Sequence, residues 1–204
     1  MLGLMATMLN FLLAPTGALT PLLVTKYFGK GALELGTVDS FFGIGMIAGG
    51  ITLGAWGGFK KKIVTSLTGI AMFSIAIIAI AAAPANSFWI MLVSMFLIGF
   101  MMPMVNGPIH ALFQSVVEPD MQGRVLSLVS SVAQAMMPLG YMIAGPITDA
   151  TSYQTWFWVA GVLNLLIGLG GFLVPALMNI EDNHKPSQPA SSESPQEMGQ
   201  IPVQ

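Results

Sequence analysis

The sequence has few charged side chains and no cysteine. Seven basic and nine acidic residues make up only 8% of its 204 residues. Soluble domains carry about 25% charged residues, so this chain lacks the solvated groups that a water-exposed surface needs. The absence of cysteine excludes disulfide frameworks, thiolate nucleophiles and cysteine-ligated metals. A membrane protein is the class that remains.

The basic residues are too few and too scattered for a nucleic-acid partner. The formal net charge is −2, whereas a protein that binds phosphate backbones needs a basic patch. The sequence also shows no nucleophile next to a base, no cluster of metal ligands and no glycine-rich phosphate loop. We therefore expect no enzymatic activity, no metal and no cofactor.

Five long windows of the sequence contain no charged residue. These windows are 1–25, 40–59, 63–117, 125–148 and 150–180. A membrane-spanning helix needs about 20 apolar residues, so four windows fit one helix each, and a turn at 84–87 divides the longest into two. The sequence thus predicts an all-α polytopic protein whose bundle, residues 1–180, has six spans. We expect the spans at about 2–24, 38–58, 63–83, 88–111, 125–147 and 156–179.

The basic residues near the ends of the spans predict the orientation. With six spans both termini share one side, and that side holds five of the seven basic residues, namely Lys60, Lys61, Lys62, Arg124 and Lys185. Lys26 and Lys30 lie on the other side. Because Lys and Arg favour the cytoplasmic side, we expect a plasma-membrane protein with cytoplasmic termini. Residues 181–204, rich in Pro, Ser and Gln, predict a disordered cytoplasmic tail.

Glycine and proline occur inside the spans. In the second span, Gly45/Gly49 and Gly50/Gly54/Gly58 follow the small-xxx-small spacing that lets membrane helices approach closely. Prolines interrupt the first and fourth spans, where Pro15, Gly17 and Pro21, and then Pro103, Asn106 and Pro108, are found. Each proline removes a helix hydrogen bond, which predicts a kink or break at membrane depth. The freed backbone must face protein or a water-filled cavity.

The first and fourth spans would be equivalent in two inverted three-helix repeats. Paired interrupted helices in such repeats mark the binding site or gate of a transporter. The residues just named are therefore candidates for lining a cavity or forming a gate. The alternative is that prolines are simply frequent in membrane helices.

Polar side chains inside the spans are few, and none is a carboxylate near mid-membrane. They include Asn10, Thr16, Asn106, His110, Gln134 and Asn164. Asp39, His110 and Gln134 are candidate proton or polar sites. We expect Asp39, at the outer end of the second span, to act as a helix cap, and His110 to form hydrogen bonds near the cytoplasmic end of its span.

Several segments resemble the major facilitator superfamily, most closely its drug-exporting branch that includes bacterial macrolide-efflux proteins. The resemblance covers about residues 1–180 and rests on Gly57 to Lys62, Leu112 to Gln114, Met137 to Gly140, Gly145-Pro146, and the pattern of Pro119, Gly123, Arg124 and Val125. The order of these segments is similar to that of the C-terminal half, spans seven to twelve. The basic loop departs from the family by offering no acidic residue at 55–58.

The resemblance implies export of hydrophobic, macrolide-like drugs by proton-coupled antiport, with no coupling residue that can be carried over. The loop containing Gly123 and Arg124 would act as a cytoplasmic latch. As half of a transporter, the chain would lie in the lipid bilayer with an N-terminal half or a second copy as partner. The alternatives are a non-transporting membrane scaffold and an inactive transporter remnant.

Overall fold

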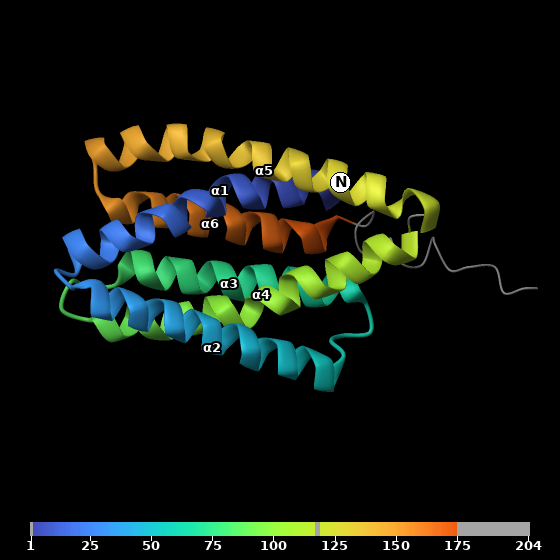
Figure 1. Cartoon of the computed structure of the whole chain (residues 1–204), viewed down its shortest axis with the longest axis horizontal. Coiled ribbons are helices and arrows are strands. Elements are labelled where there is room, and N and C mark those ends of the chain that lie inside the picture. Colours follow the sequence, from blue (N-terminus) through green and yellow to red (C-terminus); the bar gives the residue numbers. More distant parts are fainter. Residues whose placement is uncertain (1, 117–118, 175–204) are drawn as a thin grey trace, which may run out of the picture.

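The computed structural model describes residues 2–116 and 119–174, which are built of helices (Figure 1). The elements are α1 (Leu2–Leu22), the π-helix η1 (Leu23–Tyr27), α2 (Ala32–Trp56), α3 (Lys62–Ala82), α4 (Phe88–Val116), α5 (Pro119–Ala150) and α6 (Tyr153–Leu173). Six spans, the first continued by η1, are long and apolar enough to cross a membrane. The predicted six-span, all-α fold is confirmed. The predicted tail, Lys185 and positions 175–179 lie outside the described residues.

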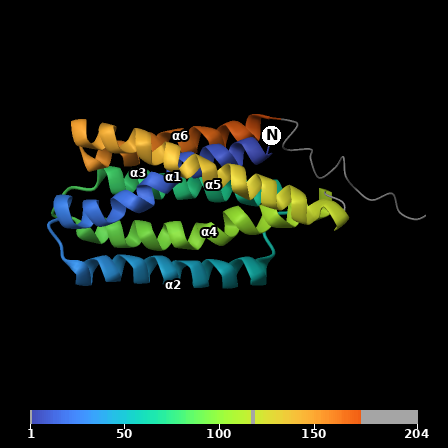
Figure 2. The same ribbon diagram turned by 45° about the horizontal axis from the view of Figure 1, so that its top comes forward.

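Consecutive helices run in opposite directions (Figures 1 and 2). The main contacts join the first three helices, α1 to α3, to the last three, α4 to α6. Helix α4 packs against α2 and α3, α1 packs against α5 and α6, and α3 packs against α6. If α1, α2 and α3 are exchanged with α4, α5 and α6, the same set of neighbours results. This is the arrangement expected of two structural repeats.

The described helices extend further into the charged segments than the predicted spans do. Helix α2 starts at Ala32, and the N–H of Gly31 donates a hydrogen bond to a carboxylate oxygen of Glu34 at 3.0 Å. Asp39 lies exposed inside α2, so its predicted role as the helix cap is wrong. The physical reason is that a charged side chain must lie outside the hydrocarbon layer of the membrane, whereas the helix that carries it can continue beyond that layer.

The segment that was predicted as a loop between the fourth and fifth spans is mostly helical. Helix α4 runs to Val116 and α5 begins at Pro119. Proline suits the first position of a helix because the N–H that it lacks has no helical partner there. Gly123 and Arg124 therefore lie in the first turns of α5, and the loop assignment of these two residues is corrected.

Of the kink or break that was predicted, no break is found, because α1 and α4 both run through their prolines. Instead, α1 passes into η1 two residues after Pro21, and α4 changes direction toward its C-terminal end (Figure 2). Pro15 leaves the carbonyl of Phe11 without its usual helical donor. That oxygen lies against Gly140 of α5, where a Cβ atom would come within 2.5 Å of it. The freed backbone thus faces protein, as the sequence led us to expect.

Close packing of α2 on α4 depends on Gly45, Gly49 and Gly99. A Cβ atom at any of them would overlap a backbone carbonyl oxygen of the other helix, that of Phe96, Phe100 or Phe42 respectively. The close-packing prediction is confirmed for Gly45 and Gly49. For Gly50 and Gly54 it is wrong, because no atom lies within 4 Å of a Cβ built there. These two glycines are on the outer face of α2.

Candidate functional site

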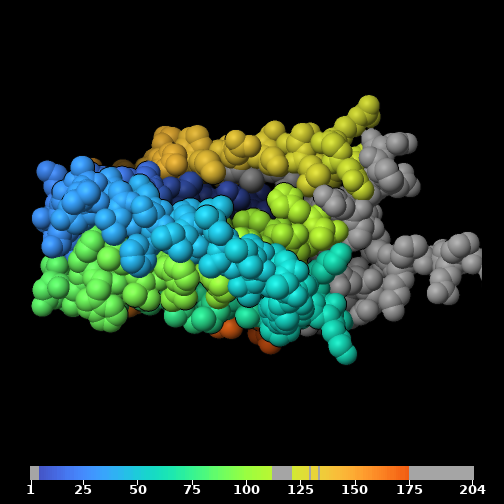
Figure 3. All heavy atoms as spheres, turned by 60° about the horizontal axis from the view of Figure 1, so that its bottom comes forward, coloured from blue at the N-terminus to red at the C-terminus, as the bar shows by residue number. Residues whose placement is uncertain are grey.

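A cavity of about 300 Å³ lies between α1, α3, α4, α5 and α6. Figure 3 shows a hollow between α4 and α5 with α1 at its floor. The wall is mainly apolar, and its polar side chains are Asn10, Asn106, His110, Ser130, Gln134 and Asn164. Such a cavity, apolar with a few polar groups, has the general character of a small-molecule site.

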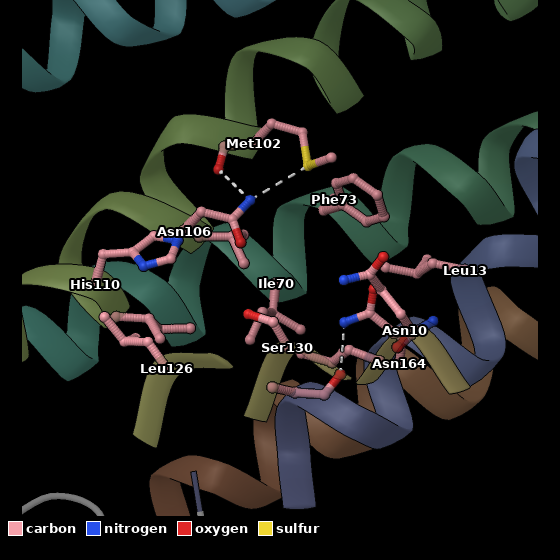
Figure 4. A pocket seen from close by; sticks show the side chains of 15 residues that line it. Asn10, Leu13, Ile70, Phe73, Met102, Asn106, His110, Leu126, Ser130 and Asn164 are labelled. Carbon is pink, nitrogen blue, oxygen red and sulfur yellow. Dashed lines mark hydrogen bonds between the residues drawn. The ribbon is translucent and has the colours of Figure 1, made fainter. Parts of the chain in front are cut away.

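Helical periodicity explains why these side chains share the cavity. Asn106 and His110 are four residues apart on α4, and Ser130 and Gln134 are four apart on α5. Side chains at this spacing lie on one face of a helix. Figure 4 shows Asn10 and Asn164 on one side of the cavity and Asn106 and His110 on the other.

The three asparagines of the wall make the same hydrogen bond. In each, Nδ2 donates to the carbonyl four residues earlier, namely Asn10 to Ala6 at 2.8 Å, Asn106 to Met102 at 3.1 Å and Asn164 to Ala160 at 2.8 Å. Because a backbone carbonyl only accepts hydrogen bonds, this contact sets the orientation of each amide. The amide oxygens remain as acceptors.

Asn164 is the most buried of these groups, with an exposed fraction of 0%. Its Oδ1 is the one buried side-chain oxygen or nitrogen within the described residues that has no hydrogen-bond partner. Buried polar groups in proteins are nearly always paired. Asn164 Oδ1 is therefore an exception to that rule within the described residues.

The structure brings together only some of the candidate site residues. Asn106, His110 and Gln134 line the cavity. The other proposed gating residues do not. Pro15 and Pro108 are buried, Pro103 is half-buried, and Gly17 and Pro21 are exposed. These prolines and the glycine shape α1 and α4 and do not contribute groups to the wall.

The remaining candidates lie away from the cavity. Asp39 is exposed on α2, and Gly123 and Arg124 are exposed on α5. Arg124 contributes its backbone carbonyl to a hydrogen bond from Ser127 Oγ at 3.0 Å. No atom lies within 4 Å of a Cβ built on Gly123, so this glycine is not required for packing within the described part of the chain.

Sequence reasoning did not select Asn10, Ser130 and Asn164 as site residues. Asn10 and Asn164 were noted only as polar residues inside spans, and Ser130 was not noted. The signal that could have found Ser130 is its spacing of four from Gln134. Asn164 has no such neighbour on α6, and only the packing of that helix places it in the wall. Among the described residues, no group of three His, Asp or Glu could hold a metal ion.

Comparison with known proteins identifies a family and several relatives. The family model described as "Major Facilitator Superfamily" matches residues 1–201. The chain is similar to "Macrolide efflux protein A" of Streptococcus pyogenes, with 30% identity over 166 residues, which is 81% of this chain and 41% of the relative. The protein of the same name from Enterococcus faecalis is 32% identical over 137 residues, 67% of this chain and 42% of the relative.

A second kind of relative also carries an efflux name. The "Multidrug efflux pump Tap" of Mycolicibacterium fortuitum is 29% identical over 183 residues, which is 85% of this chain and 43% of that protein. The matched region thus spans 41% to 43% of the length of these curated relatives. The activities that these names describe therefore belong to proteins that are longer than the matched region.

Proposed function

The chain belongs to the major facilitator superfamily, whose model matches almost its entire length, and from this premise we propose that it is one six-helix bundle of an exporter for hydrophobic compounds. The observation that carries this proposal is the largely apolar cavity, to which the three proline-containing helices, α1, α4 and α5, contribute side chains. The efflux names of its relatives support it. In this proposal the function is transport, and no chemical step is required.

We propose that a second six-helix bundle, either an N-terminal half or another copy, completes the transporter. The share of the relatives that the chain spans supports this. Within the described residues, α2 and α5 are the least buried spans, and large apolar side chains such as Ile47, Leu128 and Met142 are exposed on them. A partner bundle packed there would close the cavity, and rocking of the two bundles would open it alternately to each side.

Proton entry is the driving force that we propose. His110 is the one ionisable side chain among the described residues that line the cavity. The wall contributed by the described helices contains no carboxylate. Further coupling groups would therefore come from the partner bundle.

The proposed location is the plasma membrane, with both termini in the cytoplasm. The N-terminal end of α1, Lys60 to Lys62, Arg124 and the end of α6 fall at one end of the bundle (Figure 1). Lys26 and Lys30 fall at the opposite end. The excess of basic residues at the first end supports its placement on the cytoplasmic side.

Expression in an exporter-deficient bacterium tests the proposed function. The chain would be produced alone and together with the product of the reading frame that precedes its own. We expect lower accumulation of ethidium or a macrolide than with the empty vector in at least one setting, and a protonophore should abolish the difference. Accumulation equal to the empty vector in both settings would favour the scaffold or the inactive remnant.

A cavity-filling variant tests whether this cavity is the transport site. Ser130 is exposed to the cavity on α5, so Ser130→Trp should fill part of it and reduce efflux at least about tenfold, a change that corresponds to roughly 1.4 kcal/mol. Leu169→Trp is the control, because Leu169 is half exposed on α6 and does not line the cavity. Equal efflux by the two variants, at equal membrane levels, would place transport elsewhere.

Variants of Arg124 test the proposed latch at the cytoplasmic end. A hydrogen bond from Arg to a carboxylate or lipid phosphate contributes about 1.5–3 kcal/mol, so Arg124→Ala should slow efflux by about tenfold or more. Arg124→Lys keeps the charge but loses the planar fork of donors, and we expect an intermediate rate. Gly123→Ala should fold normally because its Cβ meets open space.

The control for the Arg124 variants is the membrane topology, measured by labelling single cysteines at each end. If Arg124 acts only by orienting the chain, Arg124→Lys will transport like the wild type and Arg124→Ala will change the labelling. Unaltered efflux by Arg124→Ala with normal insertion would remove the latch.

A further inference from the structure

We propose that Ser66 is a positioning residue, which holds the α4 segment 105–110 beside the cavity through a hydrogen bond to the backbone of that segment. The Oγ of Ser66 on α3 donates to the carbonyl oxygen of Val105 at 3.0 Å. Ser66 is 1% exposed and does not belong to the described wall of the cavity, so it acts through α4. The inference rests on the proposed function because it concerns the same cavity.

The hydrogen bond of Ser66 differs from the one that buried hydroxyl groups in this bundle usually make. Serine and threonine in a helix can donate to the carbonyl four residues earlier on the same helix. Ser74, which is also buried on α3, does so, with its Oγ 2.6 Å from the carbonyl oxygen of Ile70. Thr20 of α1 and Thr148 of α5 make the same kind of bond. Ser66 instead joins its helix to α4.

Helix α4 is weakened on both sides of Val105. Pro103 and Pro108 lack the N–H groups that would otherwise bond the carbonyls of Gly99 and Met104. The helix changes direction toward its C-terminal end (Figure 2), and prolines permit such bends. A contact from a neighbouring helix can then determine where the segment after the bend lies.

Helix α3 provides a close contact at this place. Ser66 and Gly69 are three residues apart and share one face of α3. A Cβ atom built on Gly69 would lie 3.0 Å from Cγ2 of Val105 and 3.3 Å from its backbone nitrogen. The segment that is held in this way supplies four side chains to the cavity wall, namely Val105, Asn106, Ile109 and His110 (Figure 4).

Cysteine labelling tests whether Ser66 holds the segment. The chain has no cysteine of its own, so a single one can replace Met104 or Met95, each of which is 9% exposed on α4. In the full chain in lipid nanodiscs, local opening exposes such a buried thiol to N-ethylmaleimide. Loss of one neutral hydrogen bond favours opening by about twofold to tenfold. Ser66→Ala should therefore raise the labelling rate of Met104→Cys by about that factor and leave Met95→Cys unchanged.

Ser74→Ala is the matched control. It removes a buried hydroxyl group from the same helix, but the bond that it breaks lies within α3, so both labelling rates should stay unchanged. An unchanged rate at position 104 in Ser66→Ala would overturn the inference. An equal rise at positions 104 and 95, or an equal rise in Ser66→Ala and Ser74→Ala, would also overturn it, because either result would indicate a general loosening of the bundle.

Efflux measurements separate this inference from the proposed function. At equal membrane levels, Ser66→Ala should lower ethidium efflux by about twofold to tenfold, whereas Ser74→Ala should leave it unchanged. Normal efflux by Ser66→Ala, together with faster labelling at position 104, would overturn a role of this hydrogen bond in transport. If the wild type exports nothing, the proposed function fails, and the labelling rates still decide whether Ser66 holds the segment.

Discussion

Replacing Gly49 by leucine should prevent stable assembly of the bundle, whereas the same change at the adjacent Gly50 should be tolerated. A Cβ atom at Gly49 would overlap the carbonyl oxygen of Phe100 and lie 2.9 Å from Phe100 Cα. No side-chain rotation relieves a clash with backbone, so α2 and α4 would have to separate. The neighbouring glycine contacts at Gly45 and Gly99 would then be lost as well.

The expected loss of stability is large even after the gain in helix propensity is subtracted. Leucine is a better helix former than glycine by less than about 1 kcal/mol, whereas overpacking typically costs about 1–3 kcal/mol, and a clash of Cβ with a neighbouring backbone leaves no side-chain adjustment to reduce that cost. Thermal unfolding in detergent, followed by circular dichroism and by the monodisperse fraction in size-exclusion chromatography, measures the difference. At Gly50 a Cβ meets no atom within 4 Å, so that variant should melt at or above the wild-type temperature. Similar behaviour of the two variants would show that α2 does not pack on α4 as described.

The second large effect is expected at Trp156. Its exposed fraction is 2%, and its Nε1–H donates to the carbonyl of Leu12 at 3.2 Å, which links α6 to α1. Trp156→Ala should destabilise the bundle by about 3–5 kcal/mol because it leaves a cavity in a packed interior. Trp156→Phe fills most of that space and should lose only about 1 kcal/mol for the missing hydrogen bond, together with a small packing loss.

Trp158 serves as the matched control on the same helix. It is 43% exposed, so Trp158→Ala should change the free energy of unfolding by about 1 kcal/mol or less. Urea or sodium dodecyl sulfate titration of the purified variants measures these differences. If Trp156→Ala and Trp158→Ala destabilise the bundle equally, the contact between α1 and α6 is not the one described.

The sequence predicted the helices more completely than it predicted the candidate site. The positions of the spans follow from the charge-free windows, because an unpaired charge in hydrocarbon is strongly unfavourable. The ends of α2, α4 and α5 were misjudged because charged residues can continue a helix outside the hydrocarbon. Asp39 and Arg124 were therefore assigned to a cap and a loop, although both lie inside helices.

The candidate site was predicted only in part. Polar residues inside the spans can be found by inspection, and Asn106, His110 and Gln134 do line the cavity. The prolines of α1 and α4 attracted attention because of their effect on the backbone, yet their side chains lie outside the wall. Ser130 was missed because serine is common in membrane helices and carries little signal by itself.

The sequence alone determined that this is a six-span membrane protein, and the positions of its acidic residues already excluded a carboxylate near the middle of any span. The tertiary structure alone decided which face of each helix turns inward, and so which glycines pack and which amides meet. The reason is physical. In water an apolar stripe tells which face of a helix is buried, but in a membrane both lipid and protein surroundings are apolar. Rotation of each helix is then set by close packing, as at Gly49 and Gly140, and such contacts can be seen only when the neighbouring helix is in place.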